Sequence, residues 1–237
     1  TSVPAMTEHI QQFEPWGGPA FGRENLPKLR DALAKAELDG VLIPHEDEYD
    51  NEYLPAYTQR LAWATGFTGS AGAAIVMRDR AAVFVDGRYT IQVRDQVDPK
   101  LFGFEDLVET GLGGWIKREG RKGERIGYDP RLHAPDRLAV IERAAEKAGV
   151  ELVAVEPHPI DRAWTDRPEP PRAPVKPHPI AFAGESHADK RARVGAAIRE
   201  AGADAAAITA PASIAWLFNI RGGDVQCSPL PLSSAIL

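Results

Sequence analysis

The chain has 237 residues, of which 43% are hydrophobic and 26% charged, and its formal net charge is −6. This composition is typical of a folded globular protein with one large or two modest cores, and we expect two domains. Lysine and arginine are scattered rather than clustered, which argues against nucleic acid or an anionic membrane surface as a partner. No apolar run approaches the ~20 residues that cross a bilayer.

A single cysteine, Cys227, cannot form an internal disulfide, and the polar start of the chain lacks the charged and apolar regions of a secretory signal. These features predict a cytoplasmic protein. The chain begins without methionine and ends within an apolar run at 235–237, so we expect a truncated form of a longer protein.

The first predicted element is an amphipathic helix with Asn25 as its N-cap, Pro27 in its first turn and Gly40 after its end. Residues 41–44 follow as a short buried strand. An acidic loop comes next, at 46–57. It lacks the glycine and the terminal glutamate of a calcium loop, so we interpret it as a solvated loop.

Residues 66–72 read Gly-Phe-Thr-Gly-Ser-Ala-Gly and lead into two apolar runs, 73–77 and 81–85, that predict a buried hairpin. The glycine spacing matches neither a dinucleotide fingerprint nor a phosphate loop. Ser70 also misses the pattern of a nucleophile elbow. The glycines are better explained by a tight entry into the strand, where close backbone approach or a positive φ is needed.

Arg88 lies in the segment Asp-Gly-Arg-Tyr that follows the hairpin. Its planar guanidinium could bind a peptide carbonyl or carboxylate. The alternative is a surface pair between Asp86 and Arg88. From these residues alone the surface pair is favoured, because exposed pairs of this kind are common.

Helices and strands alternate from here to residue 155, which predicts an α/β fold. The expected elements are a helix at 89–97, a strand at 101–104, a short helix around Trp115, a strand at 125–128, a helix at 135–148 and a strand at 151–155.

Eight prolines between Pro157 and Pro179 predict an extended interdomain linker, because proline removes backbone donors and cannot continue a helix or central strand. Trp164 lies in this segment and could hold the two domains together by packing against both.

Beyond the linker, Ser186 and Asp189 form a capping box that begins a helix, and Gly202 ends it. A strand at 205–209 and a helix around Trp216 follow. Helix, strand and tryptophan-containing helix thus occur twice, and the first copy is about twelve residues longer because of its acidic loop. We interpret Trp63 and Trp216 as equivalent core residues of this duplicated module.

No motif for catalysis or metal binding stands out. The histidines never occur in a zinc-binding spacing, and we expect each of them on the surface or in a loop. Cys227 has no neighbouring histidine to activate it, which favours a structural, reduced thiol. The six histidines are His9, His45, His133, His158, His178 and His187.

Three blocks of this sequence, at 66–89, 160–169 and 213–222, resemble the Xaa-Pro aminopeptidase (aminopeptidase P) family of creatinase-related enzymes. They occur in the family's order and are similar to its longer, three-domain form. The resemblance covers the chain from about Leu26 to its end. It implies a mixed-sheet, creatinase N-terminal-like α/β domain at 1–165, followed at 166–237 by the linker and an incomplete second copy of a similar module.

The resemblance also implies an activity. Enzymes of this family remove the first residue of a peptide whose second residue is proline. They use two divalent ions, commonly manganese, held by two Asp, one His and two Glu of a carboxyl-terminal catalytic domain that this chain does not reach. The resemblance therefore implies no catalytic or metal residue here, a substrate-binding role for Arg88, and a segment that is inactive alone.

The implied partners are the peptide substrate, the catalytic domain of the same protein and, as in related enzymes, a second copy. Two alternatives remain open. The chain could be a non-catalytic interaction or dimerisation module, or a fragment of a creatinase-type amidinohydrolase. The blocks at 164–168 and 215–222 favour the aminopeptidase over the amidinohydrolase.

Overall fold

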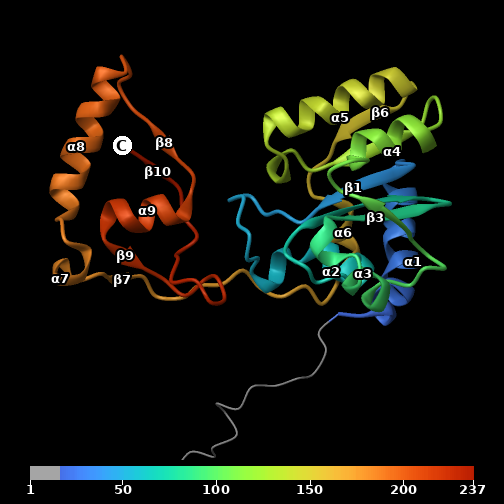
Figure 1. The fold of residues 1–237 in the computed structure, drawn as a ribbon, viewed down its shortest axis with the longest axis horizontal. Coiled ribbons are helices and arrows are strands. Elements are labelled where there is room, and N and C mark those ends of the chain that lie inside the picture. Colours follow the sequence, from blue (N-terminus) through green and yellow to red (C-terminus); the bar gives the residue numbers. More distant parts are fainter. Residues whose placement is uncertain (1–16) are drawn as a thin grey trace, which may run out of the picture.

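The computed structural model describes residues 17–237 and shows two lobes, joined by an extended segment (Figure 1). The first lobe, residues 17–165, is built on a six-stranded sheet with the order β4-β3-β2-β1-β5-β6. Its strands are β1 (Gly40–Pro44), β2 (Gly72–Met77), β3 (Ala81–Val85), β4 (Gly103–Asp106), β5 (Arg125–Tyr128) and β6 (Glu151–Ala154).

The sheet is mixed. β1 and β3 both pair antiparallel with β2, whereas β1–β5, β5–β6 and β3–β4 are parallel pairs. All strands of this sheet except β2 therefore run in one direction, and their carboxyl ends meet at one edge. The predicted α/β class and mixed sheet are confirmed.

Helices cover both faces of the sheet, which is why its central strands are apolar along their whole length. In β1, Val41 and Ile43 pack into one core and Leu42 into the other. The first core lies under α1 (Pro19–Lys35), α2 (Arg60–Thr65), α3 (Gln92–Gln96) and α6 (Pro159–Ala163), and the second under α4 (Gly111–Glu119) and α5 (Pro135–Ala148) (Figure 1).

The first helix starts earlier than predicted. It begins at Pro19, where a missing backbone N–H costs no hydrogen bond, and Gly18 is its N-cap. The prediction that Asn25 is the cap was wrong. Asn25 is buried inside α1, and its side-chain amide donates a hydrogen bond of 2.9 Å to the carbonyl of Trp63 on α2.

Most of the later elements match the prediction, and β5 and α5 have the predicted bounds. The helix expected at 89–97 is reduced to the short α3 after a 3-10 turn at Gly87–Tyr89. The strand expected at 101–104 starts later, at Gly103. The cause is a turn at Asp98, whose carbonyl accepts the N–H groups of Leu101 and Phe102.

The second lobe, residues 166–237, repeats the start of the first lobe. Apart from the short β9 between α9 and β10, its α8-β8-α9-β10 order corresponds to α1-β1-α2-β2, and β8 pairs antiparallel with β10 as β1 does with β2. Ser186 caps α8 as predicted, since its hydroxyl oxygen accepts the backbone N–H of Asp189. The elements are β7 (Lys176–Pro177), α7 (Ile180–Ala183), α8 (His187–Glu200), β8 (Ala207–Ile208), α9 (Pro211–Phe218), β9 (Ile220–Arg221) and β10 (Ala235–Ile236).

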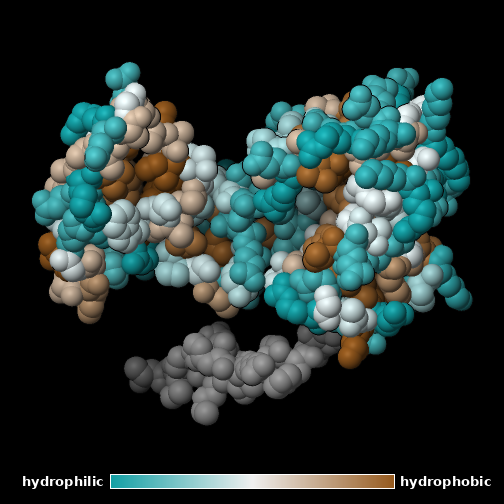
Figure 2. Space-filling view, turned by 45° about the horizontal axis from the view of Figure 1, so that its top comes forward, coloured by the Kyte–Doolittle hydropathy of each residue, from teal (hydrophilic) through white to brown (hydrophobic). Residues whose placement is uncertain are grey.

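Large apolar side chains lie at the surface of the second lobe, where Figure 2 shows hydrophobic patches. Trp216 is 44% exposed, so its predicted place in a core was wrong. Instead its ring is covered by two cations, with the Lys190 ammonium 4.7 Å and the Arg193 guanidinium 5.6 Å from the ring centroid. The other exposed apolar residues of this lobe are Val175, Ile180, Phe182 and Ile236.

A ring stack and ion pairs bind the start of the linker to the first lobe. Trp164 stacks on Trp63 with a centroid distance of 5.8 Å. Asp161 accepts two hydrogen bonds from Arg60, of 2.7 and 2.9 Å, and Arg167 pairs with the same carboxylate at 2.9 Å. Trp164 was predicted to pack against both domains. Within residues 17–237 its ring contact is with Trp63 of the first lobe, and no ring contact with the second lobe is found.

His158 lies in the loop before α6, as expected of a surface or loop residue, but it is fully buried at this junction. Its Nδ1 accepts the N–H of Ile160, and its Nε2 donates to the carbonyl of Leu42. Burial, opposed by the bond to Leu42, lowers the pKa of His158 to about 4.

Candidate functional site

The carboxyl edge of the sheet carries the polar segments of the first lobe. The acidic loop follows β1, residues 86–89 follow β3, residues 107–110 follow β4 and residues 129–133 follow β5. Ligands of open α/β sheets bind outside the carboxyl ends of the strands, because the loops that follow them converge there. This edge is therefore the expected place for a binding site.

A cavity of about 810 Å³ lies along this edge, within the size range of small-molecule and peptide sites. The end of β1, the start of β2, the first turn of α4 and one side of α5 form its walls. Its apolar side comes from α5 and from the start of β2, and its polar side from the acidic loop. Polar and charged side chains that line the cavity include His45, Glu46, Asp50, Glu52, Ser70, Glu109, His133 and Arg137.

Arg137 joins α5 to the acidic loop across one end of the cavity. Its guanidinium pairs with Glu46 and, at 2.7 Å, with Asp50. Burial raises the pKa of Glu46 to about 7, although Arg137 opposes this shift. The carboxyl group of Glu46 therefore titrates near neutral pH.

The acidic loop is more ordered than the sequence suggested. Asp47 is 2% exposed, and its carboxylate accepts the backbone N–H groups of Tyr49 and Asn51 and the side-chain amide of Asn51. The interpretation of a wholly solvated loop was wrong at this position. An Asp side chain in a loop often accepts the backbone N–H two residues further on, so Asp47 is a local turn signal that could have been recognised.

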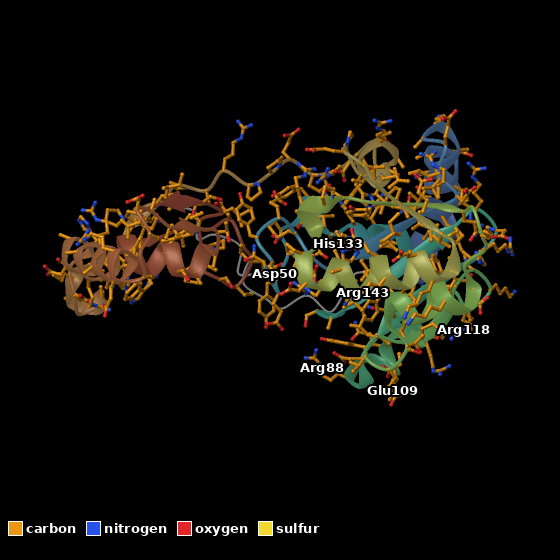
Figure 3. The ribbon with its side chains drawn as sticks, turned by 90° about the horizontal axis from the view of Figure 1, so that it is seen from above. Asp50, Arg88, Glu109, Arg118, His133 and Arg143 are labelled. Atoms are coloured by element: carbon orange, nitrogen blue, oxygen red, sulfur yellow. The ribbon has the colours of Figure 1, made fainter. Side chains whose placement is uncertain are left out.

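His133 lines the cavity, as Arg137 does, and Figure 3 labels His133. Its Nε2 atom is buried and has no hydrogen-bond partner among the residues that the structure describes. Burial lowers the pKa of His133 to about 4, so the ring is neutral at pH 7. His45, which also lines the cavity, has a pKa lowered by burial as well.

Arg88 lies at the same edge, next to the residues that follow β4. β3, which precedes Arg88, and β4 are parallel neighbours, with Val85 opposite Asp106. Figure 3 places Arg88 and Glu109 at one corner of the lobe. The side chain of Arg88 is 64% exposed. Arg88 does not line the cavity itself, but Ser70 of the cavity wall contacts its neighbour Tyr89.

The surface pair considered from the sequence is present. Arg88 Nη2 lies 2.7 Å from Asp86 Oδ2, and Arg88 Nε lies 3.1 Å from both carboxylate oxygens. These hydrogen bonds lower the pKa of Asp86. The pair occupies one edge of the guanidinium, and no hydrogen bond within residues 17–237 involves Nη1. The Nη1 donors can therefore serve an incoming oxygen acceptor.

The described residues contain no group of three or more His, Cys, Asp or Glu side chains that could hold a metal ion. Cys227 is a free, exposed thiol. His9 lies outside the described residues. Within residues 17–237, no helix has the length and apolar character needed to span a membrane.

Comparison with known proteins identifies the family. The family model described as "Creatinase/Prolidase N-terminal domain" matches residues 26–163, and a second model of the same description matches residues 166–237. The chain belongs to the creatinase/prolidase N-terminal domain family. Two successive matches of one description agree with the duplicated order of helices and strands in the two lobes.

Among curated relatives, the chain is 33% identical over 221 residues to a probable Xaa-Pro aminopeptidase P of Aspergillus niger, a match that covers 90% of this chain and 35% of the relative. It is 32% identical over 225 residues to the one of Ajellomyces dermatitidis, covering 93% and 36%. The chain thus spans about a third of the length of the curated relatives it matches and corresponds to their N-terminal region.

Among solved structures, the X-prolyl aminopeptidase of Caenorhabditis elegans is similar with a TM-score of 0.83 and 28% identity, over 91% of this chain and 37% of that one. That protein is described as a cytosolic enzyme with a di-nuclear active site. The predicted similarity to Xaa-Pro aminopeptidases and the predicted creatinase N-terminal-like fold are confirmed.

Proposed function

We propose that this chain is the peptide-positioning and assembly part of a metal-dependent, cytoplasmic Xaa-Pro aminopeptidase, which removes the residue before proline. The observation that carries the proposal is the similarity to the Caenorhabditis elegans enzyme over 91% of the chain. Residues 1–165 form the first domain, and 166–237 the linker and an incomplete second domain. The partners are a peptide with proline in second position, the catalytic domain of the same protein and a second copy of it.

The activity requires metal ions, and the described residues contain no group of three or more His, Cys, Asp or Glu side chains that could hold one. We assign two divalent ions, manganese by expectation, to the remainder of the protein. A pair of such ions supplies an activated water and stabilises the developing oxyanion. The residues of this chain would bind and orient the peptide instead.

Arg88 is the residue to which we assign this role. It projects from the carboxyl edge of the sheet beside a cavity of suitable size. Its guanidinium is oriented by Asp86 and keeps the Nη1 donors for an acceptor. A backbone carbonyl or a terminal carboxylate of the peptide provides such an acceptor.

The test is Arg88→Ala in the full-length protein. We expect KM for an Xaa-Pro peptide to rise about 10- to 100-fold, the worth of one charge-assisted hydrogen bond, with bound metal unchanged. Arg143, which is exposed on α5, provides the matched control, and Arg143→Ala should leave KM unchanged. If the kinetics of Arg88→Ala are unchanged, Arg88 forms only the surface pair with Asp86 and does not bind the peptide.

A second test concerns the chain alone. We expect the purified 237-residue chain to release no amino acid from Xaa-Pro peptides after manganese is added, because we assign the ions that activate water to the remainder of the protein. Release that follows the chain through successive purification steps, and that a chelator abolishes, would refute the proposed division of labour.

A second candidate function, an interaction or dimerisation module without catalysis, is supported by the exposed apolar residues of the second lobe, among them Phe182 at 78%. Both candidates allow a second copy, so light scattering and peptidase kinetics together distinguish them. A stable dimer of the chain that Phe182→Asp disrupts, together with unchanged kinetics in Arg88→Ala, would favour the module.

A further inference from the structure

We propose that Tyr89 is a positioning residue for Arg88, and that a chain of hydrogen bonds from Glu52 through Ser70 holds Tyr89 in place. The inference rests on the proposed contact between Arg88 and the peptide. It explains why the glycine-rich segment 66–72, the acidic loop and residues 86–89 come together at one corner of the sheet.

Two groups define the orientation of the Arg88 guanidinium. Asp86 binds one edge of it, through Nε and Nη2. The ring of Tyr89 lies under it, with the guanidinium carbon 5.2 Å from the ring centroid. A side chain as exposed as Arg88 would otherwise populate many rotamers, and holding it beforehand lowers the entropic cost of binding a ligand.

The hydrogen bonds of Tyr89 form a directed chain. The backbone N–H of Ser70 donates to the Tyr89 hydroxyl oxygen at 3.2 Å. The Ser70 hydroxyl lies 3.2 Å from Glu52 Oε1 and 3.0 Å from the Tyr89 hydroxyl. An ionised carboxylate only accepts, so Ser70 donates its hydroxyl proton to Glu52 and Tyr89 donates its own to Ser70. Every donor in the chain is therefore used.

The glycine-rich segment is shaped around this ring. A Cβ atom at Gly69 would lie 2.8 Å from Cδ1 of Tyr89 and 2.4 Å from Cζ of Phe67, closer than real Cβ contacts. Phe67 in turn meets the Tyr89 ring edge-on, with centroids 5.5 Å apart. The absence of a side chain at residue 69 thus lets the backbone pass over two aromatic rings, and this close approach is what places Ser70 within reach of the tyrosine hydroxyl.

A double-mutant cycle in the full-length protein tests the inference. We expect Tyr89→Leu to raise KM for an Xaa-Pro peptide about fivefold while kcat stays within a factor of about two, as for a loss of uniform binding. In the Arg88→Ala background, Tyr89→Leu should have no further effect, because Tyr89 acts through Arg88. Equal effects of Tyr89→Leu in both backgrounds would overturn the inference.

Two further variants separate the ring from the hydroxyl and from general effects. Tyr89→Phe keeps the ring under the guanidinium but loses the hydrogen-bond chain, so its KM should fall between the wild type and Tyr89→Leu. Tyr53→Leu removes an exposed tyrosine of the neighbouring loop and should leave KM unchanged. A Tyr89→Phe value equal to that of Tyr89→Leu would contradict the role assigned to the ring.

A measurement without peptide separates this inference from the proposed activity. In ¹⁵N relaxation of this chain, the order parameter of Arg88 Nε should fall in Tyr89→Leu and stay unchanged in Tyr53→Leu. An Arg88 side chain as ordered in Tyr89→Leu as in the wild type would overturn the positioning role. If no variant cleaves Xaa-Pro peptides, the proposed activity fails, and the relaxation data still decide whether Tyr89 orders Arg88.

Discussion

The two lobes follow the same order of elements but bury very different amounts of apolar surface. In the first, β1 and β2 are joined by further strands on both sides and covered by helices on both faces. In the second, β8 and β10 form a pair of two residues each. The buried hydrophobic residues of the second lobe are Ile214, Ala215, Leu217 and Val225, against several dozen in the first.

A helix-strand-helix order is therefore a local property, whereas a hydrophobic core needs the complete sheet. Apolar burial is the main source of folding free energy. We therefore expect the first lobe to unfold as a stable unit and the second to open at lower free energy.

The largest loss is expected at the junction between the lobes. Arg60 is 4% exposed, and Arg60→Ala leaves the Asp161 side chain, which is 9% exposed, with the more exposed Arg167 as its remaining ion-pair partner. Breaking a buried pair in this way costs about 3–5 kcal/mol. Urea unfolding should show the loss in the transition of the first lobe.

The control for this change is Arg162→Ala, on the helix α6 that also carries Asp161, because Arg162 is exposed. It should leave the first transition in place. If Arg60→Ala shifts the transition of the second lobe by as much as that of the first, the lobes are one cooperative unit and the comparison above is wrong.

The next effect is a pH dependence confined to the first lobe. The folded-state pKa of His158 is about 4, below its value of about 6.5 in the unfolded chain. The unfolded chain therefore binds the proton first, so stability is complete above pH 6.5 and is lost as the pH falls to 4. For this group the loss amounts to roughly 3 kcal/mol.

The measurement is the free energy of unfolding between pH 4 and 7 for the wild type and for His158→Gln, and the difference in slope isolates this histidine. Glu46 contributes a slope of opposite sign, since its pKa is raised, and it is common to both proteins. The exposed His187 provides the control, because His187→Gln should leave the slope unchanged. Equal slopes in all three proteins would contradict the burial of His158.

The smallest effect concerns the second lobe. Ser186→Ala removes the side-chain oxygen that caps α8 and should cost about 1 kcal/mol. The loss should appear as faster hydrogen exchange in α8 while the amides of β1 and β2 stay protected. Ser213, exposed on α9, is the matched control. A change in protection of β1 would mean that the second lobe supports the first.

The elements that could be predicted from the sequence are those with strong local signals. The hairpin of β2 and β3 follows from two apolar runs around a polar turn, and the bounds of α5 from Pro135 and Gly149. Local patterns do not show which polar groups become buried. His158 is buried by its contact with Leu42, more than a hundred residues away.

The candidate site was only partly predictable. Arg88 was recognised because the segment around it resembles a known family, not because of any property of the pair that it forms with Asp86. The cavity combines residues from four elements, and its walls exist only once α4 and α5 pack on the sheet. The predicted burial of Trp216 was wrong because an indole at a helical position is buried only where other elements cover it.

The stack of Trp63 on Trp164 gives this molecule an intrinsic optical probe. The two indoles are 5.8 Å apart and inclined by 23°, close enough for their electronic transitions to couple. Coupled indoles give a paired circular-dichroism signal that separated ones lack. Loss of that signal would report detachment of the linker in real time, without any dye or label, in this chain or in the full-length protein.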